Sequence, residues 1–185
     1  MSSEIALPYA RDIRIELLLA SPASRYEGRP AGGPQPRTPE ERAAETPPEI
    51  NVRAGLGIVG DRYFNRPAHR LASVTLFAAE TLETVAAELG TGPLDVSAAR
   101  RNVVLRGVDV DALRGATVSL DSGDGEVVLA VHRPAHPCAW MDAVLAPGAF
   151  RALRGRGGMR CEPLTDGVLR VGPAVLRSSV PLASA

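Results

Sequence analysis

Short runs of alternating apolar residues are the feature that most constrains the fold of this chain. Alternation over a few residues places every second side chain on one face, which predicts a half-buried β-strand. Ile13, Ile15 and Leu17 alternate within residues 12–19, and a short strand is predicted at 49–54. Further strands are predicted at 73–77, 102–106, 116–121, 126–132, 159–164 and 167–171. The chain therefore favours a β-rich fold.

Only short helices are predicted between these strands. The clearest helix spans 79–89 and ends before Gly90. Its apolar residues share one face: Leu82, Val85, Ala86 and Leu89. Residues 138–145 can also be helical, with helical turns near 95–100 and 109–113. Strands and helices do not alternate regularly, so a parallel α/β sheet is disfavoured. With roughly seven strands, we expect a mostly β fold, a closed antiparallel or mixed β-barrel with a few short helices.

Two hairpins are predicted from glycine-containing turns. The strands at 116–121 and 126–132 are joined by the segment SGDG. The strands at 159–164 and 167–171 are interpreted as a final hairpin, closed by a turn of Thr165, Asp166 and Gly167.

Residues 21–48 interrupt the pattern as a proline- and glycine-rich insertion. The stretch 21–49 holds seven of the sixteen prolines and many charged residues. Such a composition cannot build a core, so a long mobile loop is expected. We favour a tolerated surface insertion, because lengthening a loop costs little closure entropy. The alternative is a lid over a site.

The length is that of a single domain. A chain of 185 residues falls within the usual range of ~100–200 and can bury a core without disulfides. Residues 1–20 would supply an N-terminal arm and the first strand, and 49–177 would complete the barrel with 12–19. Residues 178–185 would form a tail. Because aromatic residues make up only 4%, the core must consist of Ala, Val and Leu.

Charge and composition disfavour several classes of function. The 21 basic and 21 acidic residues balance, whereas nucleic-acid binders usually carry a basic excess. Every basic residue is Arg, so neither a lysine Schiff base nor a Walker A lysine is available. We see no signal-peptide pattern and no run of ~20 apolar residues. We expect a cytoplasmic protein that acts on a small-molecule substrate, without nucleic acid or membrane as partner.

Cys138 is the most informative residue for function. A helix that begins at Pro137 would place Cys138 in its first turn. There the free backbone amides and the helix dipole would stabilise a thiolate. Such a thiolate could attack a substrate, carry a transferable sulfur atom or ligate a soft metal. The alternative for Cys138 is a buried structural role, which we assign to Cys161.

The histidines near Cys138 give a weaker signal. His132 and His136 have a spacing known from zinc sites, but Pro134 between them prevents a shared helix face. No second pair of ligands accompanies them, so zinc is disfavoured. His136 is interpreted as a neighbour that tunes Cys138, or as a capping or surface residue.

Two groups of arginines are candidates for binding an oxyanion. Arg100 and Arg101 precede Asn102 and a predicted strand. The second group surrounds a glycine-rich segment and comprises Arg151, Arg154, Arg156 and Arg160. Paired guanidiniums with exposed backbone amides suit a phosphate. The alternative is a solvated charged surface. Neither glycine segment has the frame of a nucleotide-binding motif.

Two further segments are ambiguous on their own. Arg62 follows Gly60 and Asp61, where a tight turn with a local ion pair would also explain the pattern. His69, beside Arg70, is either a pocket donor or an exposed loop residue.

The order of these short motifs resembles the MOSC family. This type of domain forms the C-terminal part of eukaryotic molybdenum cofactor sulfurases and also occurs as small stand-alone bacterial proteins. The resemblance covers about residues 49–172, and 12–19 is similar to the first strand of the family. The motifs that carry it are, in chain order, Gly57–Arg62, His69-Arg70, the strand and helix at 73–89, Arg101–Val104, His136-Pro137-Cys138 and Arg156-Gly157-Gly158.

The resemblance implies a β-barrel with one functional cysteine, which is Cys138 here. This cysteine would ligate the molybdenum of the pterin cofactor or carry sulfur. The resemblance further implies a pocket for the pterin phosphate. The residues that would contribute to it are Arg101 and Asn102, with Arg62, His69 and Arg156 as additional members.

Three functions follow from the resemblance. The first is a molybdenum-dependent oxidoreductase that reduces N-hydroxylated or related small substrates with a separate redox partner. The second is a sulfur carrier without turnover, in which Cys138 cycles through a persulfide supplied by a separate sulfur-donor protein. The third is a barrel that no longer binds the cofactor. Without a lysine, no pyridoxal-phosphate chemistry through a protein Schiff base is available.

Overall fold

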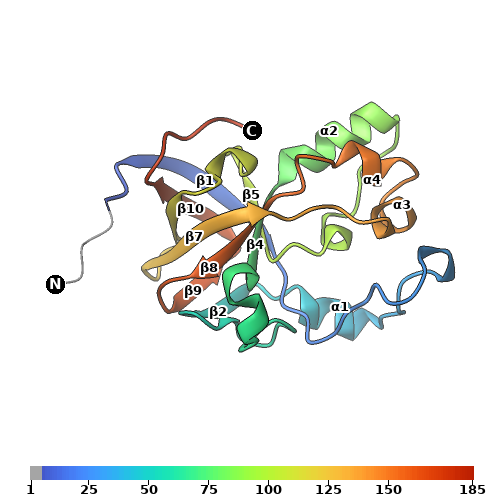
Figure 1. Cartoon of the computed structure of the whole chain (residues 1–185), viewed down its shortest axis with the longest axis horizontal. Helices are drawn as coiled ribbons and strands as arrows, with labels where there is room; N and C mark the ends of the chain where they lie inside the picture. The colour runs from blue at the N-terminus through green and yellow to red at the C-terminus, as the bar shows by residue number, and fades with distance from the viewer. Residues whose placement is uncertain (1–5) are drawn as a thin grey trace.

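A closed β-barrel of seven strands forms the centre of the structure, a computed structural model that describes residues 6–185 (Figure 1). The strand order around the barrel is β1-β10-β6-β7-β8-β4-β5. Neighbouring strands pair antiparallel except β4 and β5, which are parallel. The predicted fold class, a closed antiparallel or mixed barrel with a few short helices, is confirmed.

The described strands and helices are short. The barrel strands are β1 Tyr9–Leu18, β4 Val74–Ala78, β5 Val103–Arg106, β6 Thr117–Asp121, β7 Glu126–Pro134, β8 Met159–Pro163 and β10 Gly172–Ser178. A small antiparallel sheet in the order β3-β2-β9 consists of β2 Glu49–Arg53, β3 Gly57–Ile58 and β9 Gly167–Arg170. The α-helices are α1 Pro39–Glu45, α2 Ala79–Leu89, α3 Trp140–Val144 and α4 Ala149–Ala152. The 3-10 helices span Pro30–Gly32, Pro67–Ala72, Val96–Ala99 and Asp111–Leu113.

An aliphatic core fills the barrel. Its largest fully buried side chains come from most of the barrel strands and include Ile15, Leu76, Leu105, Leu120, Leu129 and Leu176. Burial of each such side chain is worth roughly 1.5–3 kcal/mol. The small sheet joins this core through Ile50, Val52 and Leu169. The core therefore has the aliphatic composition that the low aromatic content requires.

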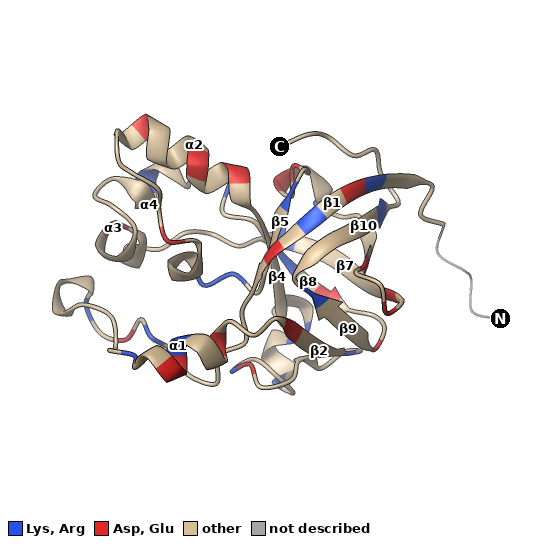
Figure 2. Cartoon of the chain, turned by 180° about the vertical axis from the view of Figure 1, so that it is seen from behind, with Lys and Arg blue, Asp and Glu red and all other residues tan. Residues whose placement is uncertain are grey.

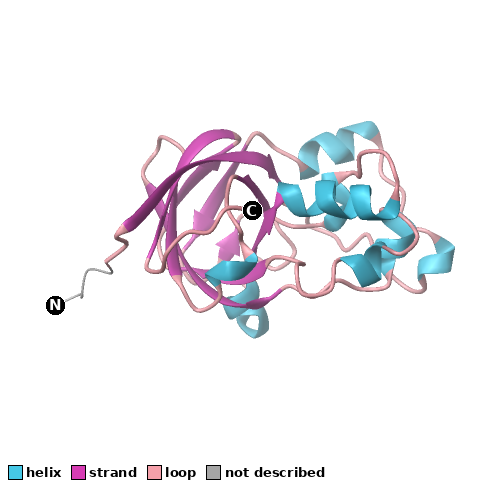
Figure 3. Ribbon diagram, turned by 90° about the horizontal axis from the view of Figure 1, so that it is seen from above, coloured by secondary structure: helices cyan, strands magenta, loops and turns pink. Residues whose placement is uncertain are grey.

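A second apolar cluster holds the helices together at one end of the barrel (Figure 3). Phe77 of β4 belongs to this cluster together with Leu82 and Val85 of α2, Trp140 of α3 and Leu153, which follows α4. Helix α2 ends as expected, with Gly90 in the left-handed conformation at φ 63°. Within residues 6–185, none of the helices has the length and apolar character that crossing a membrane requires.

The last strands pair differently from the prediction. Strand β8 lies between β4 and β7, whereas β9 pairs with β2, so the final hairpin is wrong. The carboxylate of Asp166 accepts a hydrogen bond from the backbone N–H of Ala54 and pairs with Arg53, which ties the turn to β2 instead. Strand β10, which was not predicted, closes the barrel between β1 and β6.

The insertion of residues 21–48, expected as a long mobile loop, contains helix α1 and the 3-10 helix Pro30–Gly32. Helix α1 begins after Thr38, whose side chain accepts from the N–H of Glu41 while the Glu41 carboxylate accepts from the N–H of Thr38. This reciprocal capping box, with Pro39 in the first turn, satisfies two free donors of a short helix.

Glu45, the last residue of α1, fixes the insertion to the rest of the molecule. Its carboxylate is buried and accepts hydrogen bonds from four partners: Ser21 Oγ at 2.6 Å, Arg25 Nε at 2.9 Å, Arg37 Nη1 at 2.8 Å and Arg100 Nη1 at 2.9 Å. Acidic residues of α1 thus lie beside basic residues of the insertion (Figure 2). Burial alone would raise the pKa of Glu45, but these hydrogen bonds and the charge of Arg100 lower the pKa to about 2.

Tyr26 makes the second attachment of the insertion. Its ring stacks on that of Trp140 with centroids 5.2 Å apart, and its hydroxyl donates to the carbonyl of Ala98. The insertion is therefore bound to α3 and to the segment that leads into β5.

Replacing Glu45 by Gln is expected to lower the free energy of unfolding at pH 7 by about 3 kcal/mol, since three guanidiniums lose a buried counter-charge. The pKa of Glu45 is lowered, so its contribution is present above the ordinary value of 4.5 and is lost as the pH falls toward about 2. Urea unfolding at pH 7 and pH 3 should show this difference shrinking at the lower pH. The exposed Glu27→Gln is the matched control within the insertion. Equal midpoints for the two variants at pH 7 would contradict the anchoring role.

Candidate functional site

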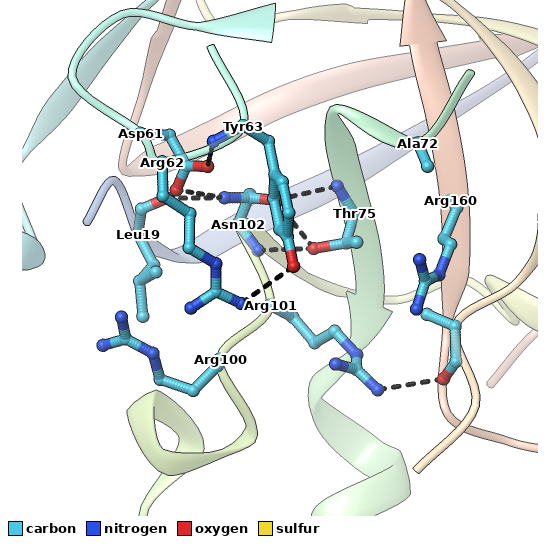
Figure 4. A pocket seen from close by; sticks show the side chains of 11 residues that line it. Leu19, Asp61, Arg62, Tyr63, Ala72, Thr75, Arg100, Arg101, Asn102 and Arg160 are labelled. Carbon is cyan, nitrogen blue, oxygen red and sulfur yellow. Dashed lines mark hydrogen bonds between the residues drawn. The ribbon is translucent and has the colours of Figure 1, made fainter. Parts of the chain in front are cut away.

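A pocket lined by arginines lies at the N-terminal ends of β4 and β5 (Figure 4). It encloses about 60 Å³. Four guanidiniums line it, from Arg62, Arg100, Arg101 and Arg160, together with one carboxylate, that of Asp61. The loop after β3 supplies Arg62, the turn before β5 supplies Arg100 and Arg101, and β8 supplies Arg160. The pocket is therefore a concentration of positive charge.

Arg101 is held by backbone carbonyl groups. Its Nε donates to the carbonyl of Gly157 at 2.8 Å, Nη1 to that of Ala99 at 3.2 Å and Nη2 to that of Ala135 at 2.9 Å. Within residues 6–185 it forms no ion pair with a carboxylate. Burial, with the nearby charge of Arg160, lowers the pKa of Arg101 to about 10. The carbonyl dipoles orient this cation without neutralising it, so it attracts an anion.

Arg100 points in a different direction and its charge is compensated. Its backbone takes the left-handed conformation at φ 56°, which is uncommon outside glycine. This turn allows Arg100 to reach Glu45, while Arg101, the next residue, lines the pocket near Ala135. Arg100 is therefore a structural partner of the insertion.

Arg62 and Arg160 complete the set of uncompensated cations. The Arg62 guanidinium lies 4.7 Å from the centre of the Tyr63 ring and donates to the Tyr63 hydroxyl at 3.3 Å. In the described part of the chain, neither Arg62 nor Arg160 forms an ion pair with a carboxylate. Of the second arginine group named in the sequence, Arg160 is the member that lines the pocket, and its pairing opposite Thr75 on β4 places it there.

Asn102 is a positioning residue. Its Oδ1 accepts from the backbone N–H and the hydroxyl of Thr75, at 3.0 and 2.8 Å. Its Nδ2 donates to the carbonyl of Leu19 at 3.0 Å and to Asp61 at 3.2 Å. A side-chain amide has two donors and room for two accepted bonds, so all four are in use. Asn102 thus connects β4, the end of β1 and the Asp61 turn, and keeps no free donor for a ligand.

Asp61 forms a tight turn and not a local ion pair. Its carboxylate accepts from the backbone N–H groups of Ser21 at 3.2 Å and Tyr63 at 3.0 Å, in addition to Asn102. These bonds fix the backbone that carries Arg62 at the pocket.

The glycine-rich segment around Arg156 has a packing role. The Arg156 guanidinium pairs with Glu88 of α2 and donates from Nε to the carbonyl of Ala152 at 2.7 Å, so it does not line the pocket. A Cβ on Gly157 would lie 2.3 Å from the Ala135 carbonyl oxygen, which only glycine avoids. This close approach brings the Gly157 carbonyl to Arg101. The placement of Arg156 gives no support to a phosphate contact.

His69 lies beside the pocket and not in it. It belongs to the 3-10 helix Pro67–Ala72, and its ring centre is 4.6 Å from that of Tyr63 at a tilt of 48°. It faces a neighbouring depression that shares Arg62 and Tyr63 with the arginine pocket.

Cys138 is exposed on the segment between β7 and α3. Helix α3 begins at Trp140, so the predicted place of Cys138 in a first helical turn is wrong. Cys138 follows Ala135, which lines the pocket, by three residues. His136 is also exposed. Cys161, in contrast, is fully buried in the barrel core, where burial raises the pKa of its thiol.

A metal ion at this site would need ligands beyond the protein side chains. Across residues 6–185, no three His, Cys, Asp or Glu side chains are grouped so as to hold a metal. The chemistry available from the chain itself is an accessible thiol beside a pocket of guanidiniums.

Comparisons with known proteins identify the family and the fold of the chain. A family model described as the MOSC domain matches residues 67–176. The YuaD protein from Bacillus subtilis has a similar structure, with a TM-score of 0.69 and 16% identity over 92% of this chain and 98% of that one. YiiM from Escherichia coli follows with a TM-score of 0.52 and 17% identity over 90% and 71% of the two chains.

At sequence identities of 16% and 17%, the similarity to these two structures shows a common fold. A search of curated proteins gave no match. The family match covers more than half of the chain and includes β4 to β8, with Arg101, Cys138 and Arg160. The chain belongs to the MOSC domain family.

Proposed function

We propose that this chain binds the molybdenum-pterin cofactor, with the phosphate of the cofactor in the arginine pocket and the Cys138 thiolate at the metal. The MOSC domain is associated with the molybdenum cofactor and is sulfurase-like. The observation that carries the proposal is the set of three guanidiniums without a carboxylate partner in residues 6–185, those of Arg62, Arg101 and Arg160, beside an exposed thiol.

The residues fit this group. Arg101 uses three of its five N–H groups on carbonyls, which leaves two for a phosphate. A pocket of about 60 Å³ has room for a small oxyanion such as a phosphate but not for a ring system. A thiolate is a preferred ligand for soft metals.

The cofactor, when bound, supplies two-electron chemistry at molybdenum. The protein contributes orientation and charge. Arg101 is fixed by three carbonyls, so it need not reorganise when an anion arrives. The stacked Tyr26 and Trp140 hold the backbone that follows Cys138. Cys138 gives up its proton to act as a ligand, and its exposure leaves the adjoining space open to a substrate.

The reaction we propose is the reduction of a small N-hydroxylated or related substrate, with electrons from a separate redox partner. The accessibility of Cys138 also favours a second candidate function. In a sulfur carrier the same thiol would hold a persulfide delivered by a sulfur-donor protein, and an exposed position is what such a transfer between proteins requires.

Measurement of molybdenum and pterin separates these functions. Protein expressed in a host that makes the cofactor should hold both, and Cys138→Ala should lose at least nine-tenths of the metal, roughly the tenfold effect of one lost ligand contact. Cys161→Ala, a change in the core, is the matched control and should keep the cofactor. Labile sulfur without molybdenum would indicate the carrier. Neither sulfur nor molybdenum in the wild type would contradict both functions.

Alkylation tests the difference between the two thiols. Cys138 is exposed, whereas burial raises the pKa of Cys161, so iodoacetamide should modify Cys138 at a lower pH and leave Cys161 unmodified until the protein unfolds. Peptide mass spectrometry over a pH series gives the rate at each site. Equally slow reaction at both would argue against a functional thiol at Cys138.

A substitution of Arg160 tests whether the arginine pocket binds phosphate. Arg160→Gln should weaken the binding of inorganic phosphate about tenfold, the effect of one charge-assisted hydrogen bond of ~1.4 kcal/mol. Arg151→Gln, which removes an exposed arginine outside the pocket, should leave the affinity unchanged. Titration calorimetry provides both values, and equal affinities would remove Arg160 from the site.

A further inference from the structure

An apolar patch lies around the 3-10 helix Pro67–Ala72, whose last residue lines the arginine pocket. Three leucines form this leucine patch, with exposed fractions of 40%, 51% and 38%: Leu56, Leu71 and Leu164. Each leucine directly follows a member of one contacting set. The N–H of Gly55 donates to the carbonyl of Pro163 at 2.7 Å, and a Cβ on Gly55 would lie 3.6 Å from Nε of Arg70. The three leucines therefore surround one point of the surface.

Two exposed arginines border the same region and are called the arginine rim, Arg66 and Arg133. Arg66 directly precedes the 3-10 helix. Arg133 of β7 pairs opposite Arg160 of β8, so the two side chains share a face of the sheet. Arg160 lines the arginine pocket together with Ala72 of the 3-10 helix (Figure 4), and both β7 and β8 contact this helix. The rim thus lies between the leucine patch and the pocket.

The protein does not neutralise the charge of the arginine rim. Within residues 6–185, neither rim arginine forms an ion pair with a carboxylate. The nearby carboxylate of Glu162 is buried and is already bound by Arg70 at 2.6 Å and His132 at 3.3 Å. Exposed apolar side chains with charged residues at their edge are typical of a site that binds another protein.

The charge of this surface selects the kind of partner. Two copies of this chain would meet through the same patch on both subunits, which brings one arginine-rich surface against another. Like charges placed together across an interface cost free energy. A protein with carboxylates around an apolar centre complements both the rim and the leucines.

We propose that the leucine patch and the arginine rim bind an acidic electron-transfer protein. The inference rests on the proposed function, whose reaction needs a separate redox partner. Reduction of R–NHOH to R–NH2 takes up two electrons and two protons and releases one water; the bound partner supplies the electrons and the solvent supplies the protons. Strand β7 leads from Arg133 into the segment that carries Cys138, so a partner held here lies beside the proposed position of the metal.

Calorimetry on the purified full chain tests this surface with two acidic probes, a flavodoxin and a plant-type 2Fe–2S ferredoxin, and with the basic cytochrome c. The acidic proteins should bind and cytochrome c should not. Arg66→Glu and Arg133→Glu, which change residues outside the arginine pocket, should each weaken binding about fivefold at low salt and less at high salt, because salt screens exposed charges. Leu71→Ser should weaken binding about fivefold at both salt concentrations, since apolar contacts are not screened.

The matched controls are Arg14→Glu and Tyr9→Ser. Both residues are exposed on β1, which lies across the ring of strands from β7 and β8, so neither change should alter the affinity.

The outcomes separate the docking surface from the proposed function. If the wild type holds molybdenum but binds neither acidic probe, the docking surface is overturned and the proposed function stands. The same holds if cytochrome c binds equally well, or if the rim and leucine variants bind as tightly as the controls. If the expected pattern of binding is found in a protein that takes up no molybdenum, the surface stands as a docking site, and the partner's role as electron donor fails together with the proposed function.

Discussion

The arrangement of the site depends on one buried carboxylate, that of Glu45. Four arginines around a small pocket would repel one another, and a buried cation without a partner is costly. Glu45 neutralises Arg100 and binds Arg25 and Arg37 at the same time. The positive charge left to act on a ligand is then that of Arg62, Arg101 and Arg160. The insertion that carries Glu45 contributes no residue to the lining of the pocket, but it neutralises one of the arginines there.

Close packing of the backbone makes the second contribution. Gly157 approaches the Ala135 carbonyl so closely that a Cβ would not fit, and both carbonyls then accept hydrogen bonds from Arg101. The sequence showed glycines beside arginines, a pattern that suggests phosphate binding through exposed amides. In the structure the same glycines position carbonyl groups, and Arg156 turns away to Glu88. The glycine- and arginine-rich motif therefore marks the position of the pocket correctly, but it positions carbonyl groups that bind Arg101 and not amides that bind a phosphate.

Elements defined by local patterns could be predicted from the sequence, and those defined by distant partners could not. The alternation in β1 and the apolar face of α2 were both visible. Strand β10 was missed because only Val171 separates it from β9, with Gly172 at φ 134° as its first residue. Cys138, Arg101 and Arg160 were named from their local sequence, whereas Glu45 is connected to the site only through a contact across the fold.

The segment that matches the family and the segments outside it make different contributions to the site. Arg101, Arg160 and Cys138 lie within the segment 67–176 that defines the family, on or beside barrel strands fixed by the core. Arg62 and the insertion lie outside that segment, and a buried ion-pair network and the Asp61 turn hold them against the barrel. A barrel fold can remain constant while such an attached segment changes, because the segment contributes few side chains to the barrel core. Under the proposed function, the residues that select the ligand are therefore to be sought in 21–66, and those that would bind the phosphate and the metal in the segment 67–176.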